Sequence, residues 1–239
     1  MSSEAQVPSA PPAQDWPVLS PHERRVLGVL VEKAKTTPDA YPMSLNALTT
    51  GCNQKSNRDP LLNLSDEDVE EALASCQKRG LVMKITGSRV DRWRHLLYEA
   101  WRVEKVDMAV LTELLLRGPQ TEGELRARAS RMEPIPDLDV LRGVLRRMAE
   151  RKLIVWLGEE GRRGTTLTHG FHDPRELEAL RAAAPVVAAA PSEPRPRTPE
   201  PALADALAQL AELRETVAQL QATVAELSQR VAALQQPAG

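Results

Sequence analysis

The chain has 239 residues, of which 42% are hydrophobic and only 3% are aromatic. That length allows one large domain, or two small ones with a tail, whose cores rest on Leu, Val and Ala. Lys and Arg number 31 against 33 Asp and Glu, for a net charge of -2. This balance excludes a generally polyanion-binding surface, so any nucleic-acid binding must come from a local patch.

The N-terminal residues 1–18 are rich in Pro, Ser and Ala and are predicted to form a disordered arm. They contain no apolar signal-peptide segment, and no run elsewhere approaches the length of a membrane span. We therefore expect a soluble, cytoplasmic protein that does not associate with membranes.

A first set of elements is predicted between residues 19 and 100. Ser20 suits the N-cap of a helix, with Pro21 in its first turn and Glu23 completing a capping box. Ser44 is expected to cap a short second helix that Gly51 stops. A third helix is expected to begin at Ser65 and to end at Gly80, before strands over 81–85 and 92–98.

The same order of elements then recurs between residues 101 and 180. One helix is predicted to end at Gly118, a second to be capped by Thr121 with Glu124 three residues on, and a third to cover 137–152. Strands are predicted over 153–157 and 165–171. Three helices followed by a hairpin, occurring twice, predict a mainly α fold with small β-hairpin wings (α+β), arranged as tandem winged helix-turn-helix domains.

The C-terminal part, from residue 181 on, differs from the two sets of elements in composition and periodicity. Residues 181–201 are rich in Ala and Pro and predict an extended linker. Residues 202–236 carry an unbroken heptad pattern that predicts a coiled coil, with Val at a and Leu at d favouring two parallel strands. A homodimer is expected, and a helix docked on its own domains is the alternative. The proposed dimerisation positions are Leu210, Leu213, Val217, Leu220, Val224, Leu227, Val231 and Leu234.

The sequence gives little indication of a catalytic, cofactor-binding or metal-binding site. The histidines at 22, 95, 169 and 172 are scattered, and the pair His169 and His172 lacks a third ligand of suitable spacing. Neither Cys52 nor Cys76 lies in a metal-ligand spacing. Lys55 and Arg58 allow a lowered pKa for the Cys52 thiol, but a half-buried structural cysteine is the favoured interpretation. We therefore expect neither an enzyme nor a bound cofactor.

Nucleic-acid binding is the function that the predicted layout invites, because the third helix of such a domain usually enters the major groove. In the first set this helix opens with a run of carboxylates, DEDVEE, which would meet phosphates unfavourably. The second set is richer in arginine, although interleaved carboxylates allow intrahelical ion pairs instead. The candidate nucleic-acid-binding residues are Lys55, Arg58, Arg126, Arg128, Arg131, Arg142, Arg146, Arg162 and Arg163.

The polar stretch CNQKSNRDP, residues 52–60, connects the predicted second and third helices. Asn53 and Asn57 belong to the types that bond to nearby backbone in turns, which favours a rigid loop. Lys55 and Arg58 remain candidates for direct contact with a ligand.

Several segments resemble the YceH family of bacterial proteins over about residues 19–171. They are HERRVLGVLVEKAKTTPDAYPMSLNAL, CNQKSNRDP, GLV, GSRV and RGPQTEGELRARASRM. The resemblance implies a tandem winged-helix fold and carries over no catalytic or ligand-binding residue. The short second wing, the Pro-rich linker and the coiled coil depart from the family's usual pattern.

Two functional hypotheses follow. The first is a dimeric winged-helix DNA-binding protein, a transcriptional regulator that contacts double-stranded DNA. The alternative is a winged-helix scaffold of the chromosome-organising type, which binds a protein partner and does not read DNA directly. Fold alone does not choose between them.

Overall fold

The computed structural model describes residues 16–87 and 90–184, which belong to one compact unit of the chain. About half of these residues are helical, and their strands form two small antiparallel sheets, so the structure is of the mixed α+β type. In this part of the chain no helix is both long and apolar enough to cross a membrane. The predicted coiled coil and most of the predicted linker lie outside the described residues.

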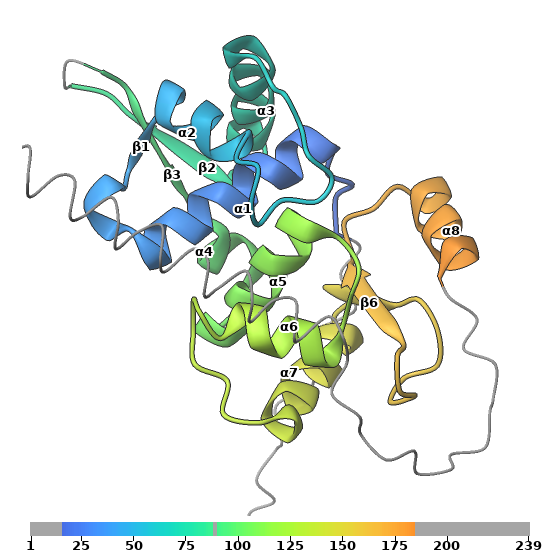
Figure 1. Ribbon diagram of the computed structural model, residues 1–239. Helices are drawn as coiled ribbons and strands as arrows, with labels where there is room; N and C mark the ends of the chain where they lie inside the picture. Colours follow the sequence, from blue (N-terminus) through green and yellow to red (C-terminus); the bar gives the residue numbers. More distant parts are fainter. Residues whose placement is uncertain (1–15, 88–89, 185–239) are drawn as a thin grey trace, which may run out of the picture. The chain divides into compact units, whose positions relative to one another are not determined.

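The first repeat, residues 21–95, consists of three helices and a three-stranded sheet (Figure 1). Its elements are α1 (Pro21–Thr36), η1 (Pro38–Ala40), β1 (Met43–Ser44), α2 (Leu45–Cys52), α3 (Asp66–Lys78), β2 (Val82–Ile85) and β3 (Arg92–His95). Strand β3 lies between β1 and β2 and is antiparallel to both, with Trp93 opposite Met43 and His95 opposite Val82.

The second repeat, residues 105–169, has the same order of elements. A short helix, α4 (Leu97–Trp101), connects it to the first. It consists of α5 (Lys105–Arg117), β4 (Gln120–Thr121), α6 (Glu122–Ala129), α7 (Leu138–Glu150), β5 (Ile154–Trp156) and β6 (Thr166–His169). Strand β6 lies between β4 and β5, as β3 does between β1 and β2. A final helix, α8 (Pro174–Ala183), follows.

The helix starts follow the local signals in the sequence. Ser20 accepts a hydrogen bond from the Glu23 amide while the Glu23 carboxylate accepts one from the Ser20 amide, which is the predicted capping box. Thr121 and Glu124 form the same pair at α6. Short-range sequence therefore determines where these helices begin.

Three predicted boundaries are wrong for identifiable reasons. Gly51 does not stop α2 but lies inside it, where an added Cβ would come 2.7 Å from Val29 Cγ1. The strand predicted over 92–98 ends at His95, because Leu97 and Trp101 are both buried at helical spacing in α4. Helix α8 continues to Ala183, past the predicted start of the linker at residue 181.

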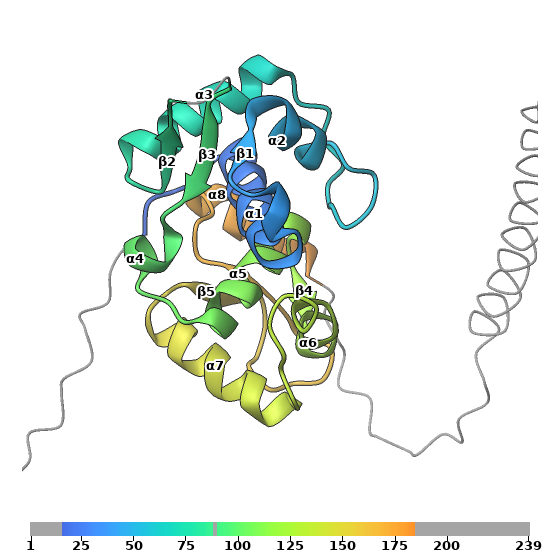
Figure 2. The ribbon, with the colours of Figure 1, turned by 90° about the vertical axis from the view of Figure 1, so that its left-hand side faces the viewer.

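The core is continuous across both repeats and centres on the packing of α1 against α5 (Figure 2). The helices approach closely at Gly28, where an added Cβ would lie 2.8 Å from the Leu116 side chain. All residues of α5 from Asp107 to Leu116 are buried, as is typical of a helix at the centre of a core. The two repeats therefore share one hydrophobic interior.

We expect Gly28→Ala to destabilise the protein by about 1–3 kcal/mol, because Leu116 is fully buried and cannot yield without repacking α5. The matched control is Gly143→Ala in α7, where an added Cβ meets no atom within 4 Å. That change should be neutral or stabilise by up to about 1 kcal/mol through helix propensity. Urea unfolding followed by circular dichroism measures both, and equal midpoints for the two variants would contradict the packing argument.

Candidate functional site

Arg58 is an interior residue. Its side chain is 0% exposed and forms an ion pair from Nη2 to Glu32 Oε2 at 2.6 Å. Its Nε donates to the Gly51 carbonyl at 3.1 Å, and its Nη2 also donates to Gln54 Oε1. These bonds tie the loop between α2 and α3 to α1 and use the guanidinium internally. Arg58 is thus not placed to contact a phosphate, contrary to the prediction.

The rest of this loop, residues 53–65, is held by its own polar groups. The Asn53 side chain accepts from the Leu64 amide and donates to the Leu64 carbonyl, both at 2.8 Å. Asn57 has a positive φ of 60° and accepts a hydrogen bond from Arg117. The Asp59 amide donates to the Leu116 carbonyl at 2.9 Å. These contacts agree with the rigid-loop interpretation, and Lys55 is left exposed on the loop.

Three of the candidate arginines, Arg126, Arg128 and Arg131, have partners within the second repeat. Arg126 donates to the Pro136 carbonyl at 3.1 Å. Arg128 donates to Gln120 Oε1 at 2.8 Å and lies 3.6 Å from Glu124. Arg131 pairs with Glu113 at 3.2 Å. Each is engaged within the fold, so these arginines have a structural role beside any contact with a ligand.

The other candidate arginines lie around one cleft. It has a volume of about 550 Å³ and is formed by the start of α6, the start of α7 and the turn between β5 and β6. Arg142, Arg162 and Arg163 line it, and Glu122 is the one carboxylate residue among its lining residues. We call this surface the arginine cleft. Arg146 projects from the next turn of α7 and lies 3.8 Å from Glu160 of the hairpin.

Arg142 in the arginine cleft is paired with two carboxylates, Glu122 on α6 and Asp139 one turn earlier on α7, the latter at 3.4 Å. The Arg142 guanidinium and Glu122 are 3.0 Å apart, and this hydrogen-bonded partner raises the pKa of Arg142 further. The Arg142 side chain remains 41% exposed. Exposed pairs of this kind contribute little stability and are screened by salt. Arg142 can therefore exchange Glu122 for another anion at small cost.

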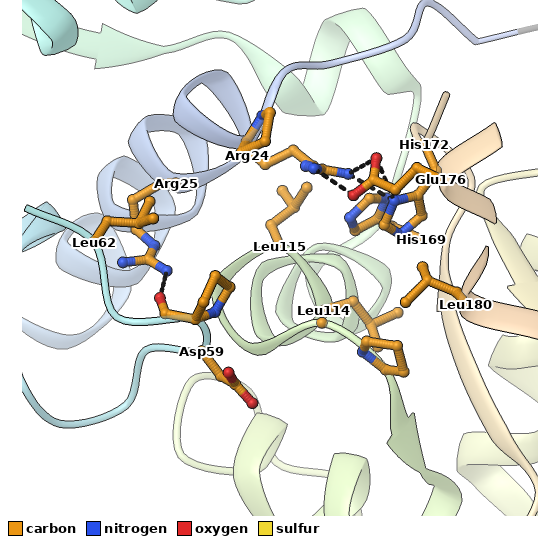
Figure 3. A pocket seen from close by; sticks show the side chains of 14 residues that line it. Arg24, Arg25, Asp59, Leu62, Leu114, Leu115, His169, His172, Glu176 and Leu180 are labelled. Atoms are coloured by element: carbon orange, nitrogen blue, oxygen red, sulfur yellow. Dashed lines mark hydrogen bonds and ion pairs between the residues drawn. The ribbon is translucent and has the colours of Figure 1, made fainter. Parts of the chain in front are cut away.

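A second feature is a partly open pocket between α1, the loop at residues 59–62, the end of α5, and α8 (Figure 3). Arg24 of α1 donates from Nη2 and Nη1 to the two carboxylate oxygens of Glu176 at 2.8 and 2.9 Å. His172 lies against both, with Nδ1 2.6 Å from Arg24 Nη1 and 3.0 Å from Glu176 Oε2. We call these three residues the Arg24 cluster.

The contacts of His172 are compatible with either neutral tautomer. Its Nδ1 faces both a donor, Arg24 Nη1, and an acceptor, Glu176 Oε2, while its Nε2 lies 2.8 Å from Thr168 Oγ1, which can donate or accept. Burial lowers the pKa of His172, although its contact with Glu176 opposes the shift. His172 is therefore neutral near pH 7, and Arg24 bridges it to the Glu176 carboxylate.

His169 stacks on His172 with ring centroids 3.9 Å apart. Its Nδ1 accepts from the Phe171 amide at 3.2 Å, and full burial holds its pKa well below the usual value. No group of three or more His, Cys, Asp or Glu in the described part of the chain could hold a metal ion. The two histidine rings stack on each other, and each ring has its own hydrogen-bond partner, Phe171 for His169 and Thr168 for His172.

Neither cysteine has the environment of a nucleophile. Cys52 and Cys76 are fully buried and unpaired. Burial raises the pKa of each thiol to about 12, and nearby Arg25 and Arg58 only partly offset this for Cys52. The lowered pKa considered for Cys52 is thus wrong, and its packing role agrees with the favoured interpretation.

The Arg24 cluster was not predicted from the sequence. His172 and Glu176 are 148 and 152 residues away from Arg24, and α8 was not recognised as a helix. One signal was present: the charged run at residues 23–25 immediately precedes the apolar stripe of α1, and all three residues are buried. Buried charges need partners, so such a run indicates distant counter-charges.

Comparison with known proteins shows similarity over both repeats. The family described as "Protein of unknown function, DUF480" matches residues 19–163. A UPF0502 protein of Rhodopirellula baltica is 51% identical over 159 residues, which cover 66% of this chain and 67% of that protein. A UPF0502 protein of Geotalea daltonii is 54% identical over 130 residues, or 54% and 60% of the two lengths. One from Pseudomonas paraeruginosa is 41% identical over 195 residues, or 81% and 86%.

Folding stability should fall as the pH is lowered from 7 towards 4.5. Burial lowers the pKa of His95 to about 4 and that of His169 well below 6.5, so the unfolded chain binds protons in this range that the folded chain does not. Each such histidine contributes a slope of at most about 1.4 kcal/mol per pH unit. Urea unfolding at half-unit pH steps measures the slope.

The carboxylate of Glu176 titrates in a separate window, because its lowered pKa makes its contribution disappear only below the ordinary value of 4.5. His95→Gln should therefore reduce the slope between pH 6.5 and 4.5 specifically. An unfolding free energy that stays constant from pH 7 to 5 would contradict the assignment.

Proposed function

This chain belongs to the family of proteins of unknown function DUF480, and we propose that it is a DNA-binding protein acting as a dimeric transcriptional regulator. The double-stranded DNA would be contacted through the arginine cleft of the second repeat. The observation that carries the proposal is the convergence of Arg142, Arg162 and Arg163 on one cleft lined by a single carboxylate residue.

The order of elements supports a winged-helix assignment for both repeats, in line with the resemblance to the YceH family. Each repeat runs helix, strand, helix, helix and hairpin, with the last strand in the middle of the sheet. In such a domain the third helix enters the major groove. That helix is α7 in the second repeat, and the turn between β5 and β6 is the wing beside it. Arg142 lies on the helix and Arg163 on the wing.

The charges on the two repeats favour the second as the DNA-facing one. Helix α3 exposes Asp66, Glu67, Glu70 and Glu71, which repel phosphates. On α7 the positions that correspond to Glu67 and Glu70 are Asp139 and Arg142, and the exposed Arg146 and Arg147 lie one turn further on. The pair of Arg146 with Glu160 is at 3.8 Å with both side chains more than half exposed, so phosphates can compete for it, whereas Arg147 is paired at 3.5 Å with the buried Asp107.

We further propose that two chains pair through the heptad positions between residues 210 and 234, so that two arginine clefts face two half-sites. This segment lies outside the described residues, and the proposal rests on its sequence pattern alone.

The DNA proposal is tested by fluorescence anisotropy with a random 30-base-pair duplex across a salt series. We expect salt-sensitive binding, and we expect the double variant Arg162→Glu/Arg163→Glu to bind at least about tenfold more weakly. Loss of two phosphate contacts should also reduce the slope of log K against log salt by about 2. Glu122→Gln should tighten binding, because it removes the lining carboxylate and leaves Arg142 with Asp139 as its one charged partner in the described part of the chain.

The matched control is Arg175→Glu/Arg181→Glu, which reverses the same amount of charge at exposed positions of α8. It should retain near-wild-type affinity. Equal losses for the two double variants would show a general charge effect in place of a cleft. Absence of duplex binding at 20 mM salt would overturn the proposal.

Dimerisation is tested by light scattering on the full chain. Replacing two central d positions, Leu220→Asp and Leu227→Asp, should convert a dimer into a monomer without changing the circular dichroism of the repeats. A wild-type chain that is monomeric at 50 μM would contradict the pairing.

A protein-interaction scaffold is the second candidate, supported by a different observation. The hairpin of the first repeat exposes Met83, Ile85 and Val90 at 41%, 38% and 55%, beside the acidic face of α3. Exposed apolar side chains rimmed by charge are typical of protein-binding surfaces. Duplex binding that is absent at low salt, or insensitive to the cleft variants, would favour this candidate.

A further inference from the structure

The partly open pocket beside the Arg24 cluster combines an apolar cavity with a polar end. Its volume is about 140 Å³. Leu62, Leu114, Leu115 and Leu180 form apolar walls, and Figure 3 shows them around the space next to Arg24, His172 and Glu176. An engineered protein cavity of about 150 Å³ accommodates benzene, so this one accommodates a group of about six carbon atoms.

The polar end of the pocket already binds a carboxylate, that of Glu176. Arg24 is only 6% exposed and donates hydrogen bonds to both oxygens of one carboxylate in a bidentate arrangement. Such bidentate pairing is specific for planar anions such as carboxylates. His172 adds a third polar atom beside the same carboxylate. The cluster is a built carboxylate site whose occupant is the side chain of Glu176.

The helix that supplies this carboxylate is weakly attached. Helix α8 has no buried residue, and the Glu176 side chain is 39% exposed. Glu176 fills the polar end but leaves the apolar cavity beside it, whose wall includes Leu180 of the same helix. A free molecule carrying both a carboxylate and an apolar group would satisfy both ends at once. Movement of α8 costs little buried apolar area.

We propose that this pocket binds a small organic monocarboxylic acid with an apolar body of about six carbons. Its carboxylate takes the place of Glu176 on Arg24, and its apolar body lies among Leu62, Leu114 and Leu115. Glu176 thereby acts as an internal competitor, and α8 forms the outer wall of the site. The proposal concerns binding alone and does not depend on the chain binding DNA.

The experiment titrates the full chain with benzoate in a calorimeter at pH 7, with benzamide and acetate as matched probes. Benzoate should bind, while benzamide lacks the charge and acetate lacks the apolar body, so both should bind at least about tenfold more weakly. Glu176→Gln removes the competitor's charge and should tighten benzoate binding by about tenfold. Arg24→Gln should abolish it.

A second pair of variants separates the cavity from the charge. Leu180→Trp places a large side chain in the pocket wall and should abolish benzoate binding. Leu177→Trp, on the same helix but not lining the pocket, should leave it unchanged. Thermal unfolding confirms that each variant is folded.

The proposal is overturned if benzoate and benzamide bind equally or if neither the wild type nor Glu176→Gln binds benzoate below 10 mM. It is also overturned if Leu180→Trp and Leu177→Trp behave alike. Those results would make the Arg24 cluster a structural ion pair only.

Discussion

The close approach of α1 and α5 at Gly28 is the constraint on which the rest of the structure depends. With no side chain at residue 28, Leu116 packs directly onto the α1 backbone, and the two central helices become buried on almost every side. Each repeat alone would leave one of these helices with an exposed apolar face. Because a unit of this size has a marginal core, sharing one interior is what makes both repeats stable.

Burial of the two central helices also explains the distribution of charged side chains. Glu32 of α1 forms an ion pair with Arg58, and Glu113 of α5 forms one with Arg131. Arg25 of α1 donates hydrogen bonds to the carbonyls of Cys52 and Pro60. Glu32 and Arg25 both hold the segment at residues 52–60 against α1, and Glu113 holds the segment just after α6 against α5. A buried charge that lost its partner would be costly, so these pairs fix the positions of the loops more than they add stability.

The sequence predicted the features that depend on neighbours along the chain and missed those that depend on distant partners. Ser20 and Thr121 carry capping signals within three residues of the helix start, so these starts were found. Gly51 looks in the sequence like a glycine that ends a helix. In the structure its missing side chain instead makes room for Val29, which lies far from it in the sequence. Likewise, nothing near Arg58 distinguishes an exposed cation from one paired with Glu32, 26 residues away.

The candidate sites show the same division. Arg142, Arg162 and Arg163 were predicted on neighbouring elements of the second set, and their meeting around one cleft follows from how the hairpin folds back beside α7. The Arg24 cluster was not predicted, because Arg24 and Glu176 belong to opposite ends of the described chain. The residue type shows that a side chain is cationic, but only the fold determines whether that side chain faces solvent, a carboxylate or a ligand.

A net charge of -2 is compatible with local anion binding because individual surfaces of the molecule differ in their charge. Carboxylates concentrate on the exposed face of α3 in the first repeat, while the arginine cleft of the second carries three cationic residues to one anionic residue. Within about a Debye length of roughly 8 Å, an approaching phosphate experiences the cleft and not the average of the molecule. The acidic face then repels the same phosphate from the first repeat. The proposed contact of the second repeat with DNA relies on this difference between the two surfaces and not on the total charge.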